Sequence, residues 1–170
     1  MNVVLALVAC AVGERTMVVE EPVSAVFVAL SSGEISVISV EREGVFLDHE
    51  GWCLSEDEGG TGLEIVDGEL FFGGEGRDCG GELYVEVPLG TPVAVALDRG
   101  EVDVELRAPA DLSVCAAAGE VSVVVPAGEY VLDLDLGAGE LWTSGIEGSE
   151  RAEHRIGISL AAGEVSLLGI

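Results

Sequence analysis

Four glutamates recur at the same position of a repeated sequence motif (the phrase), directly after a glycine. They are Glu101, Glu120, Glu140 and Glu164, and their glycines lie 19, 20 and 24 residues apart. If the copies stack on one another, these carboxylates form a column at the strand spacing of about 4.8 Å, where like charges repel. The carboxylates then either spread into water or bind cations between them, and calcium suits such oxygen ligands. The four glutamates are therefore candidate cation ligands, with calcium as the candidate ion.

Cysteine is the second residue type in this sequence whose side chain could take part in chemistry. If the chain is exported, Cys53 and Cys79 are expected to form a disulfide, because both lie in an irregular glycine-rich segment where a cross-link stabilises most. Cys115 is then left over, at a position where the other copies carry mostly small residues. That position favours a small packed side chain over a reactive thiol. The sequence has no Cys-x-x-Cys pair and no Cys/His cluster, so zinc is not indicated.

The sequence favours a protein without catalytic residues or a cofactor. Carboxylates are abundant, but no pair stands out as an acid and a base. His49 and His154 lie in polar segments, and neither belongs to a recognisable triad or metal motif. We therefore expect a binding or structural protein rather than an enzyme.

The first ten residues, MNVVLALVAC, form an apolar run that ends at a cysteine. The run Leu7-Val8-Ala9-Cys10 resembles the bacterial lipobox, in which cleavage precedes a cysteine that receives lipid. This resemblance predicts lipidation at Cys10 and a membrane-anchored protein of the cell envelope, in the outer membrane or at the cell surface. The alternative is a buried first strand in a cytoplasmic protein, because no Lys or Arg precedes the short run.

Composition limits the classes of partner. The 170 residues suffice for one well-buried domain, and 49% of them are hydrophobic, which excludes disorder as the main state. The formal net charge is −25, with seven arginines and no lysine. Such a surface repels a phosphate backbone, so nucleic acid is excluded, whereas cations, basic proteins and basic polymers remain suitable partners.

The elements that position the glutamates are strands that turn at glycine. Around Gly119, Leu112 and Val114 precede the turn and Val121 and Val123 follow it, and the other copies repeat this alternation. Alternation with a period of two is typical of strands with one buried face. The predicted repeat turns are Gly33, Gly100, Gly119, Gly139 and Gly163.

Two all-β architectures fit this repeat. Each copy could form one coil of a β-solenoid, a stack resembling a single-stranded β-helix, or consecutive copies could form an antiparallel meander or sandwich. The similarity of the copies position by position favours the stack. The predicted divisions are a signal segment at 1–10, a tether at 11–22 and a β-solenoid domain at 23–170. An irregular glycine-rich insertion at 41–81 interrupts that domain, with Gly68-Glu69 as a degenerate copy of the phrase.

The turn sequences resemble those of a known family. Ser31-Ser32-Gly33-Glu34, Ala117-Ala118-Gly119-Glu120 and the lead-in Val-Glu-Val-Pro-Leu-Gly-Thr-Pro at 85–92 are similar to the putative-adhesin, or toast-rack, domain of bacterial envelope proteins. The resemblance covers 23–170 and implies a β-solenoid-like fold, an extracytoplasmic location and a role in interaction or envelope sensing. An adhesin-like module is the first hypothesis. A regulatory accessory of a membrane signalling partner and a calcium-dependent carbohydrate or surface binder are the alternatives.

The last copy of the phrase ends without a polar cap, at Leu167-Leu168-Gly169-Ile170. The ends of solenoids normally need a cap. We therefore expect the coil at 156–170 to be covered by the insertion, by a second copy in a homo-oligomer, or by a partner protein.

Overall fold

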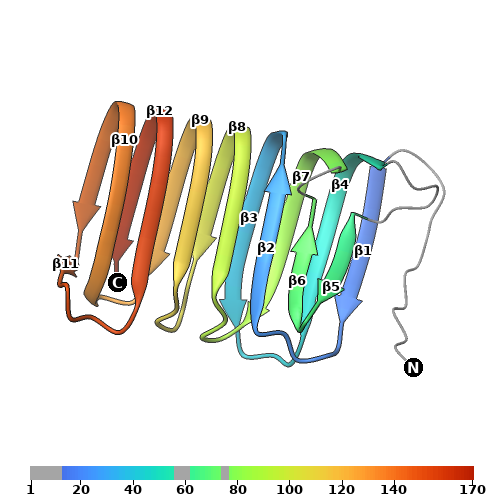
Figure 1. The fold of residues 1–170 in the computed structure, drawn as a ribbon, viewed down its shortest axis with the longest axis horizontal. Helices are drawn as coiled ribbons and strands as arrows, with labels where there is room; N and C mark the ends of the chain where they lie inside the picture. Colours follow the sequence, from blue (N-terminus) through green and yellow to red (C-terminus); the bar gives the residue numbers. More distant parts are fainter. Residues whose placement is uncertain (1–12, 56–61, 74–76) are drawn as a thin grey trace.

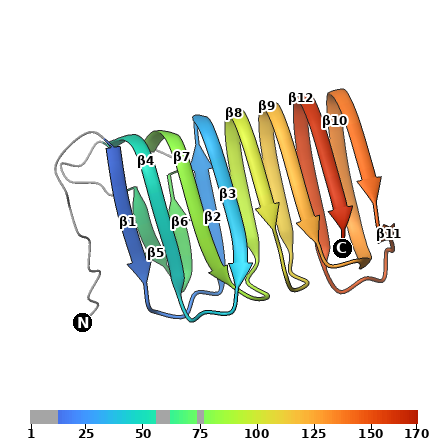
Figure 2. The same cartoon turned by 180° about the vertical axis from the view of Figure 1, so that it is seen from behind.

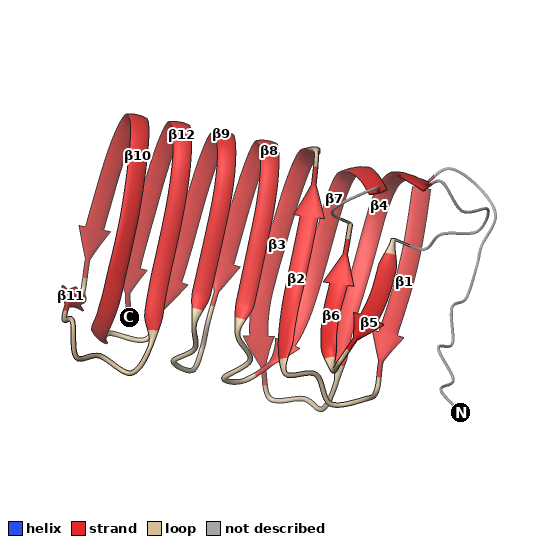
Figure 3. Ribbon diagram, viewed as in Figure 1, coloured by secondary structure: helices blue, strands red, loops and turns tan. Residues whose placement is uncertain are grey.

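The computed structural model describes residues 13–55, 62–73 and 77–170, and the described chain is all-β, as predicted (Figure 3). A membrane-spanning helix is absent from these residues. The strands are β1 Gly13–Val19, β2 Ala25–Leu30, β3 Ser32–Val40, β4 Val45–Ser55, β5 Leu63–Val66, β6 Glu69–Phe72, β7 Arg77–Pro88, β8 Val93–Glu105, β9 Leu112–Val125, β10 Gly128–Ser144, β11 Ile146–Gly148 and β12 Arg155–Gly169.

The long strands β8, β9, β12 and β10 each form one coil of a stack. Each rises along one face, bends and descends along the opposite face (Figures 1 and 2). Each of these strands contains a glycine with positive φ: Gly100, Gly119, Gly163 and Gly139. Neighbouring coils pair in parallel, with glycine opposite glycine at every bend. Parallel pairing of like positions confirms the solenoid-like stack and excludes a hairpin meander in this region.

The core lies between the two faces of the stack. Inward side chains of each coil come from alternate positions on both sides of the bend, as the sequence pattern predicts. In β12, for example, Ile156, Ile158, Leu160, Val165 and Leu167 are each at most 1% exposed. One continuous apolar cluster runs from β1 to β12.

The order of the coils differs from their order in the sequence. β12 lies between β9 and β10 and pairs in parallel with both. The cover of the coil at 156–170 therefore differs from the expectation: β10 of the same chain pairs along it, in the place where the insertion, a second copy or a partner was expected. The outward residues of the two coils suit their places: β12, inside the stack, presents Gly157, Ser159 and Ser166, whereas β10, at its end, presents Asp133 and Asp135 to solvent.

The N-terminal region corrects two predicted boundaries. The predicted tether at 11–22 contains β1, which pairs antiparallel with β4 and buries Met17 and Val19. The described strands of the predicted insertion at 41–81 belong to the same sheet. β6 pairs with β2 and β7 pairs with β3, both in parallel, so they extend the stack. The copy of the phrase in this region is Gly81-Glu82, in register with Gly33-Glu34, and Gly68 instead lies in the turn between β5 and β6.

The glycines at the bends are required by the close approach of neighbouring coils. Gly119 has a φ of +138°, and a Cβ atom added there would lie 1.8 Å from the carbonyl oxygen of Gly100. Gly100 stands in the same relation to Gly33. Any side chain at these positions would have to displace the backbone of the next coil.

Candidate functional site

A line of eight glutamates runs along the glycine bend for the whole length of the described stack, and we call it the glutamate ladder. The paired strands place each glutamate directly opposite the next. All eight side chains are exposed. Neighbouring strands lie about 4.8 Å apart, so the ladder is a regular row of carboxylates. In spatial order its members are Glu14, Glu50, Glu82, Glu34, Glu101, Glu120, Glu164 and Glu140.

The four glutamates singled out from the sequence therefore share one column, with Glu164 between Glu120 and Glu140. Among the described residues, no three His, Cys, Asp or Glu side chains converge as a metal site would require. Calcium binding by the ladder stays a prediction. The arrangement instead presents a linear polyanion to solvent, with charges repeated at a fixed spacing.

Glu34 belonged to the predicted repeat at Gly33, and the three remaining members of the ladder were missed by sequence reasoning. Glu14 and Glu82 each follow a glycine, so the Gly-Glu dipeptide could have identified them. Glu50 precedes Gly51 because β4 runs antiparallel to β7, which reverses the order of the dipeptide. A search for the phrase in both directions would have found all three.

The predicted cysteine sites fall in different surroundings. Cys10 lies outside the described residues. Cys79 is buried and disulfide-bonded, and the backbone of Cys53 lies directly opposite it on β4. The side chain of Cys53 is not among those described, so the Cys53–Cys79 disulfide stays a prediction that the strand register supports. Cys115 is a free, exposed thiol on the outer face of β9.

The outer face of the stack around Cys115 is shallowly hollowed. The hollow has a volume of about 450 Å³, and small side chains of neighbouring coils, including Ala96 and Ser159, line it. The residue of β10 opposite Ser159 is Asp135, so a carboxylate borders the hollow.

The two histidines also have different surroundings. His49 lies on β4 inside the core, 1% exposed, and not in an irregular polar segment as the sequence suggested. Its Nε2 atom is 3.2 Å from the Gly80 carbonyl oxygen, and its Nδ1 atom has no hydrogen-bond partner among the described residues. Burial lowers the pKa of His49 below 6.5, and the hydrogen bond to Gly80 opposes this shift. His154 is half-buried, with Nδ1 3.7 Å from the Asp111 carboxylate.

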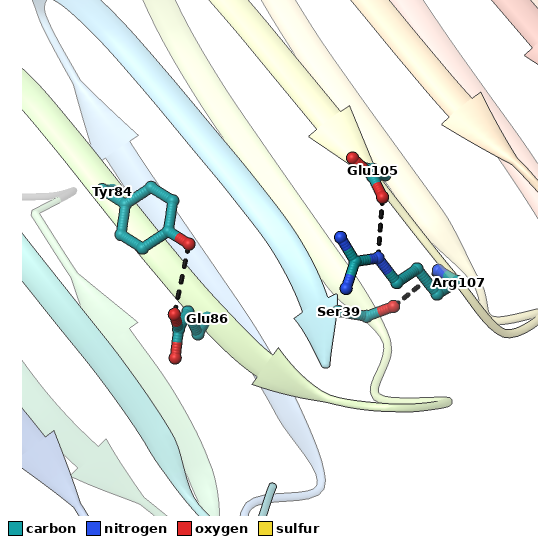
Figure 4. A network of polar contacts seen from close by, with 5 residues as sticks. All are labelled: Ser39, Tyr84, Glu86, Glu105 and Arg107. Carbon is teal, nitrogen blue, oxygen red and sulfur yellow. Dashed lines mark hydrogen bonds and ion pairs between the residues drawn. The ribbon is translucent and has the colours of Figure 1, made fainter. Parts of the chain in front are cut away.

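A polar cluster occupies the outer face of the strand segments that follow the bends (Figure 4). The Tyr84 hydroxyl donates to Glu86 at 3.2 Å, and burial, reinforced by Glu86, raises the pKa of Tyr84. The Arg107 amide donates to the buried Ser39 hydroxyl at 2.7 Å, while the Arg107 guanidinium donates to Glu105 at 2.7 Å. The Arg107–Ser39 hydrogen bond joins β3 to the chain just after β8, whereas the other two contacts are local, and both carboxylates are paired.

Comparisons with known proteins identify the fold but no family. No protein-family model matches the chain, and no curated protein matches it. A crystal structure described as a putative cell adhesion protein from Clostridium sporogenes is similar, with a TM-score of 0.50 and 12% sequence identity. The similarity covers 92% of this chain and 99% of that one. At that identity the likeness shows the fold alone.

Proposed function

We propose that this protein is a non-enzymatic, adhesin-like binding module whose glutamate ladder binds cationic surfaces or polymers. The observation that carries the proposal is the ladder itself: eight exposed carboxylates in one row on a rigid stack. A row of fixed charges attracts an extended polycation along its whole length, which a compact cluster cannot do. The adhesin-like role also agrees with the description of the similar Clostridium sporogenes protein and with the toast-rack resemblance of the turns.

The same proposal places the module at the bacterial cell envelope, anchored through a lipid on Cys10. This location rests on the sequence Leu7-Val8-Ala9-Cys10. The test is the intact mass and membrane fractionation of the full chain expressed in a bacterial host. A membrane-bound species that begins at Cys10 and carries a diacylglycerol is the expected result. A soluble chain that still begins at Met1 would contradict the anchor.

Binding is tested with poly-L-lysine as the cationic probe and the unlipidated Cys10→Ser chain as the receptor. We expect binding that weakens steeply between about 0.05 M and about 0.5 M salt, because exposed charges are screened. A parallel titration with calcium separates the two kinds of cation. A rise in melting temperature with calcium alone would favour the calcium-dependent binder, and absence of poly-L-lysine binding at low salt would contradict the proposal.

A further inference from the structure

The strand at the C-terminal end of the stack has an open edge. β12 pairs with one side of β10 along residues 131–144, whereas β11 covers the other side only at 128–130. Within the described residues, no strand pairs with that second side between 131 and 144. Figure 1 shows this edge at the end of the stack, beside β11. An open edge of this length is a template for pairing with another strand.

Hydrogen bonds show which backbone groups face the open edge. The Val131 amide donates to the His154 carbonyl on the β12 side at 2.9 Å, and the Tyr130 carbonyl accepts from Ser149 on the β11 side at 2.9 Å. Successive residues of a strand point their backbone groups to opposite edges. The amides and carbonyls of Leu132, Leu134 and Leu136 therefore face the open edge.

No neighbouring layer from the described part of the chain covers the side chains at this end. Leu132, Leu134 and Leu136 are only partly buried, although they pack against the core. Leu141 and Trp142 are 41% and 66% exposed. The matching inward residues of β12 are buried almost completely, so one further coil would bury the leucines of β10 in the same way.

We propose that a second copy of this chain supplies that layer, pairing its own β10 antiparallel about a two-fold axis parallel to the strands. The bend of β10 is suited to self-pairing, because its inward residues are arranged symmetrically about the bond between Ala138 and Gly139. Leu136 and Leu134 lie three and five positions before Gly139, and Leu141 and Thr143 lie two and four positions after it. Antiparallel pairing then places Leu136 opposite Leu141 of the second copy. It also places Leu134 opposite Thr143 of the second copy, so all inward side chains remain in one core.

The outward residues select this register. Asp135 lies opposite Trp142 of the second copy and Asp133 lies opposite Ser144 of the second copy, so no carboxylates face each other. A register shifted by two residues in one direction also keeps inward residues opposite inward residues. That register, however, places Asp135 opposite Glu140 of the second copy. Facing like charges destabilise strand pairs.

The other end of the molecule shows that an antiparallel strand can follow the stack round its bend. β4 pairs antiparallel with β7 on both sides of the bend, with Gly51 opposite Gly81. Its inward residue Leu47 lies opposite Val85, and both are buried. The proposed dimer places two copies in the same antiparallel relation, with Gly139 opposite Ala138 of the second copy at the bend.

The charge of the protein gives the dimer a characteristic salt dependence. Each copy carries a formal charge of −25, so two copies repel each other. Salt screens that repulsion, and the backbone and apolar contacts of the β10 edge are little affected by it. Dimerisation is therefore strengthened by salt, whereas polycation binding by the ladder is weakened by salt. The two proposals can thus fail independently.

The first test is sedimentation equilibrium of the full chain carrying Cys10→Ser, from about 0.05 M to about 0.5 M salt. We expect a monomer–dimer equilibrium that shifts toward the dimer as salt rises. A monomer at every salt concentration would overturn the proposal, as would a dimer that dissociates with salt.

A matched pair of substitutions locates the interface. Thr143→Lys places an inward charge opposite Leu134 of the second copy, and Thr143 is already exposed in the monomer. We expect dimerisation at least about tenfold weaker, although the lysine reduces the net repulsion between copies. Ser166→Lys makes the same charge change on the exposed outer face of β12 and should dimerise at least as well as the parent chain. Equal losses in both variants would overturn the proposal.

The register is tested by cross-linking. In a Cys10→Ser and Cys115→Ser background, the double substitution Leu134→Cys with Thr143→Cys should give a covalent dimer on oxidation. Each single substitution should give none, because identical positions lie apart in the proposed pairing. Association in solution without a covalent dimer of the double variant would overturn this register.

Discussion

The two ends of this molecule reach the same stacked core by different means. In the C-terminal region, β8, β9, β12 and β10 are copies of one phrase that pair in parallel through a column of glycines. In the N-terminal region, β1 and β4 run antiparallel to their neighbours, and their sequences follow the phrase poorly. The glutamate ladder nevertheless continues across both regions without interruption.

The features that the fold requires are those that the two regions share. Both regions keep a glycine at the bend and a carboxylate beside it, whatever the direction of the strand. The N-terminal region adds a disulfide at Cys79, the buried His49 and the stacked rings of Phe27 and Phe71, whose centroids are 4.7 Å apart. The C-terminal coils have aliphatic repeats in place of these features. Stability should therefore depend on the bend glycines in both regions and, in the N-terminal region, also on these specific contacts.

The largest expected effect comes from a bend glycine. Gly119→Ala should destabilise the protein by more than about 4 kcal/mol or prevent folding, because the new Cβ meets the Gly100 carbonyl at 1.8 Å and φ is +138°. The matched control is Gly157→Ala, whose Cβ would lie 3.9 Å from its nearest atom and should cost less than about 1 kcal/mol. Equal losses in urea denaturation would contradict the role given to the bend.

The next effect distinguishes the two regions through their cysteines. Removal of the disulfide by Cys79→Ser should destabilise the protein by about 2–4 kcal/mol, because the cross-link limits the unfolded chain. Cys115→Ser should be nearly neutral, since that thiol is free and exposed. Hydrogen exchange should quicken in β4 and β7 of the Cys79 variant and stay slow in β9. Uniform quickening would indicate that the two regions unfold as one unit.

His49 should make the N-terminal region sensitive to acid. Its pKa is lowered in the folded state by burial, so below pH 6.5 the unfolded chain binds more protons than the folded one. The His49 contribution to stability is complete above 6.5 and is lost as pH falls through the folded-state pKa, with a limiting slope of about 1.4 kcal/mol per pH unit. In melting curves, His49→Leu should lose stability less steeply with acid than the parent chain. An equal loss of stability with falling pH in both proteins would show that His49 does not cause the acid sensitivity.

The smallest effects concern the surface cluster that joins the two regions. Ser39→Ala should cost about 1 kcal/mol, because the buried hydroxyl accepts the Arg107 amide. Arg107→Ala keeps that amide and removes only a pair whose side chains are 53% and 43% exposed, so it should cost less than about 0.5 kcal/mol. Chemical denaturation would measure both, and the reverse order would contradict the account of this cluster.

The sequence was sufficient for the parts of the fold that repeat. Alternation around Gly100, Gly119, Gly139 and Gly163 predicted the coils, the inward residues and the column of glutamates. The order of the coils was not predictable from the phrase, because identical bends and alternating strands fit any neighbour. The longer link between Gly139 and Gly163 was the available signal, since a coil that lies out of order needs additional chain to reach its place.

The N-terminal region was predicted poorly for a physical reason. Strand alternation in β1 and β4 is short or broken by polar residues, and antiparallel pairing reverses the Gly-Glu order at Glu50-Gly51. The sequence placed His49 in an irregular polar segment, because its polar neighbours conceal the alternation that directs its side chain inward. Burial of such a residue depends on pairing with β7, which is distant in the chain.

The central claim is that the glutamate ladder acts as one binding face. The most direct test compares two variants of equal net charge for their affinity to poly-L-lysine at low salt. One replaces Glu101, Glu120, Glu140 and Glu164 with glutamine, and the other replaces the exposed residues Asp98, Asp103, Asp133 and Asp135 with asparagine. We predict that the glutamine variant binds at least about tenfold more weakly than the asparagine variant, because only the first interrupts the row of carboxylates. Equal affinities would show that net charge alone attracts the polymer, and would contradict the ladder as the binding site.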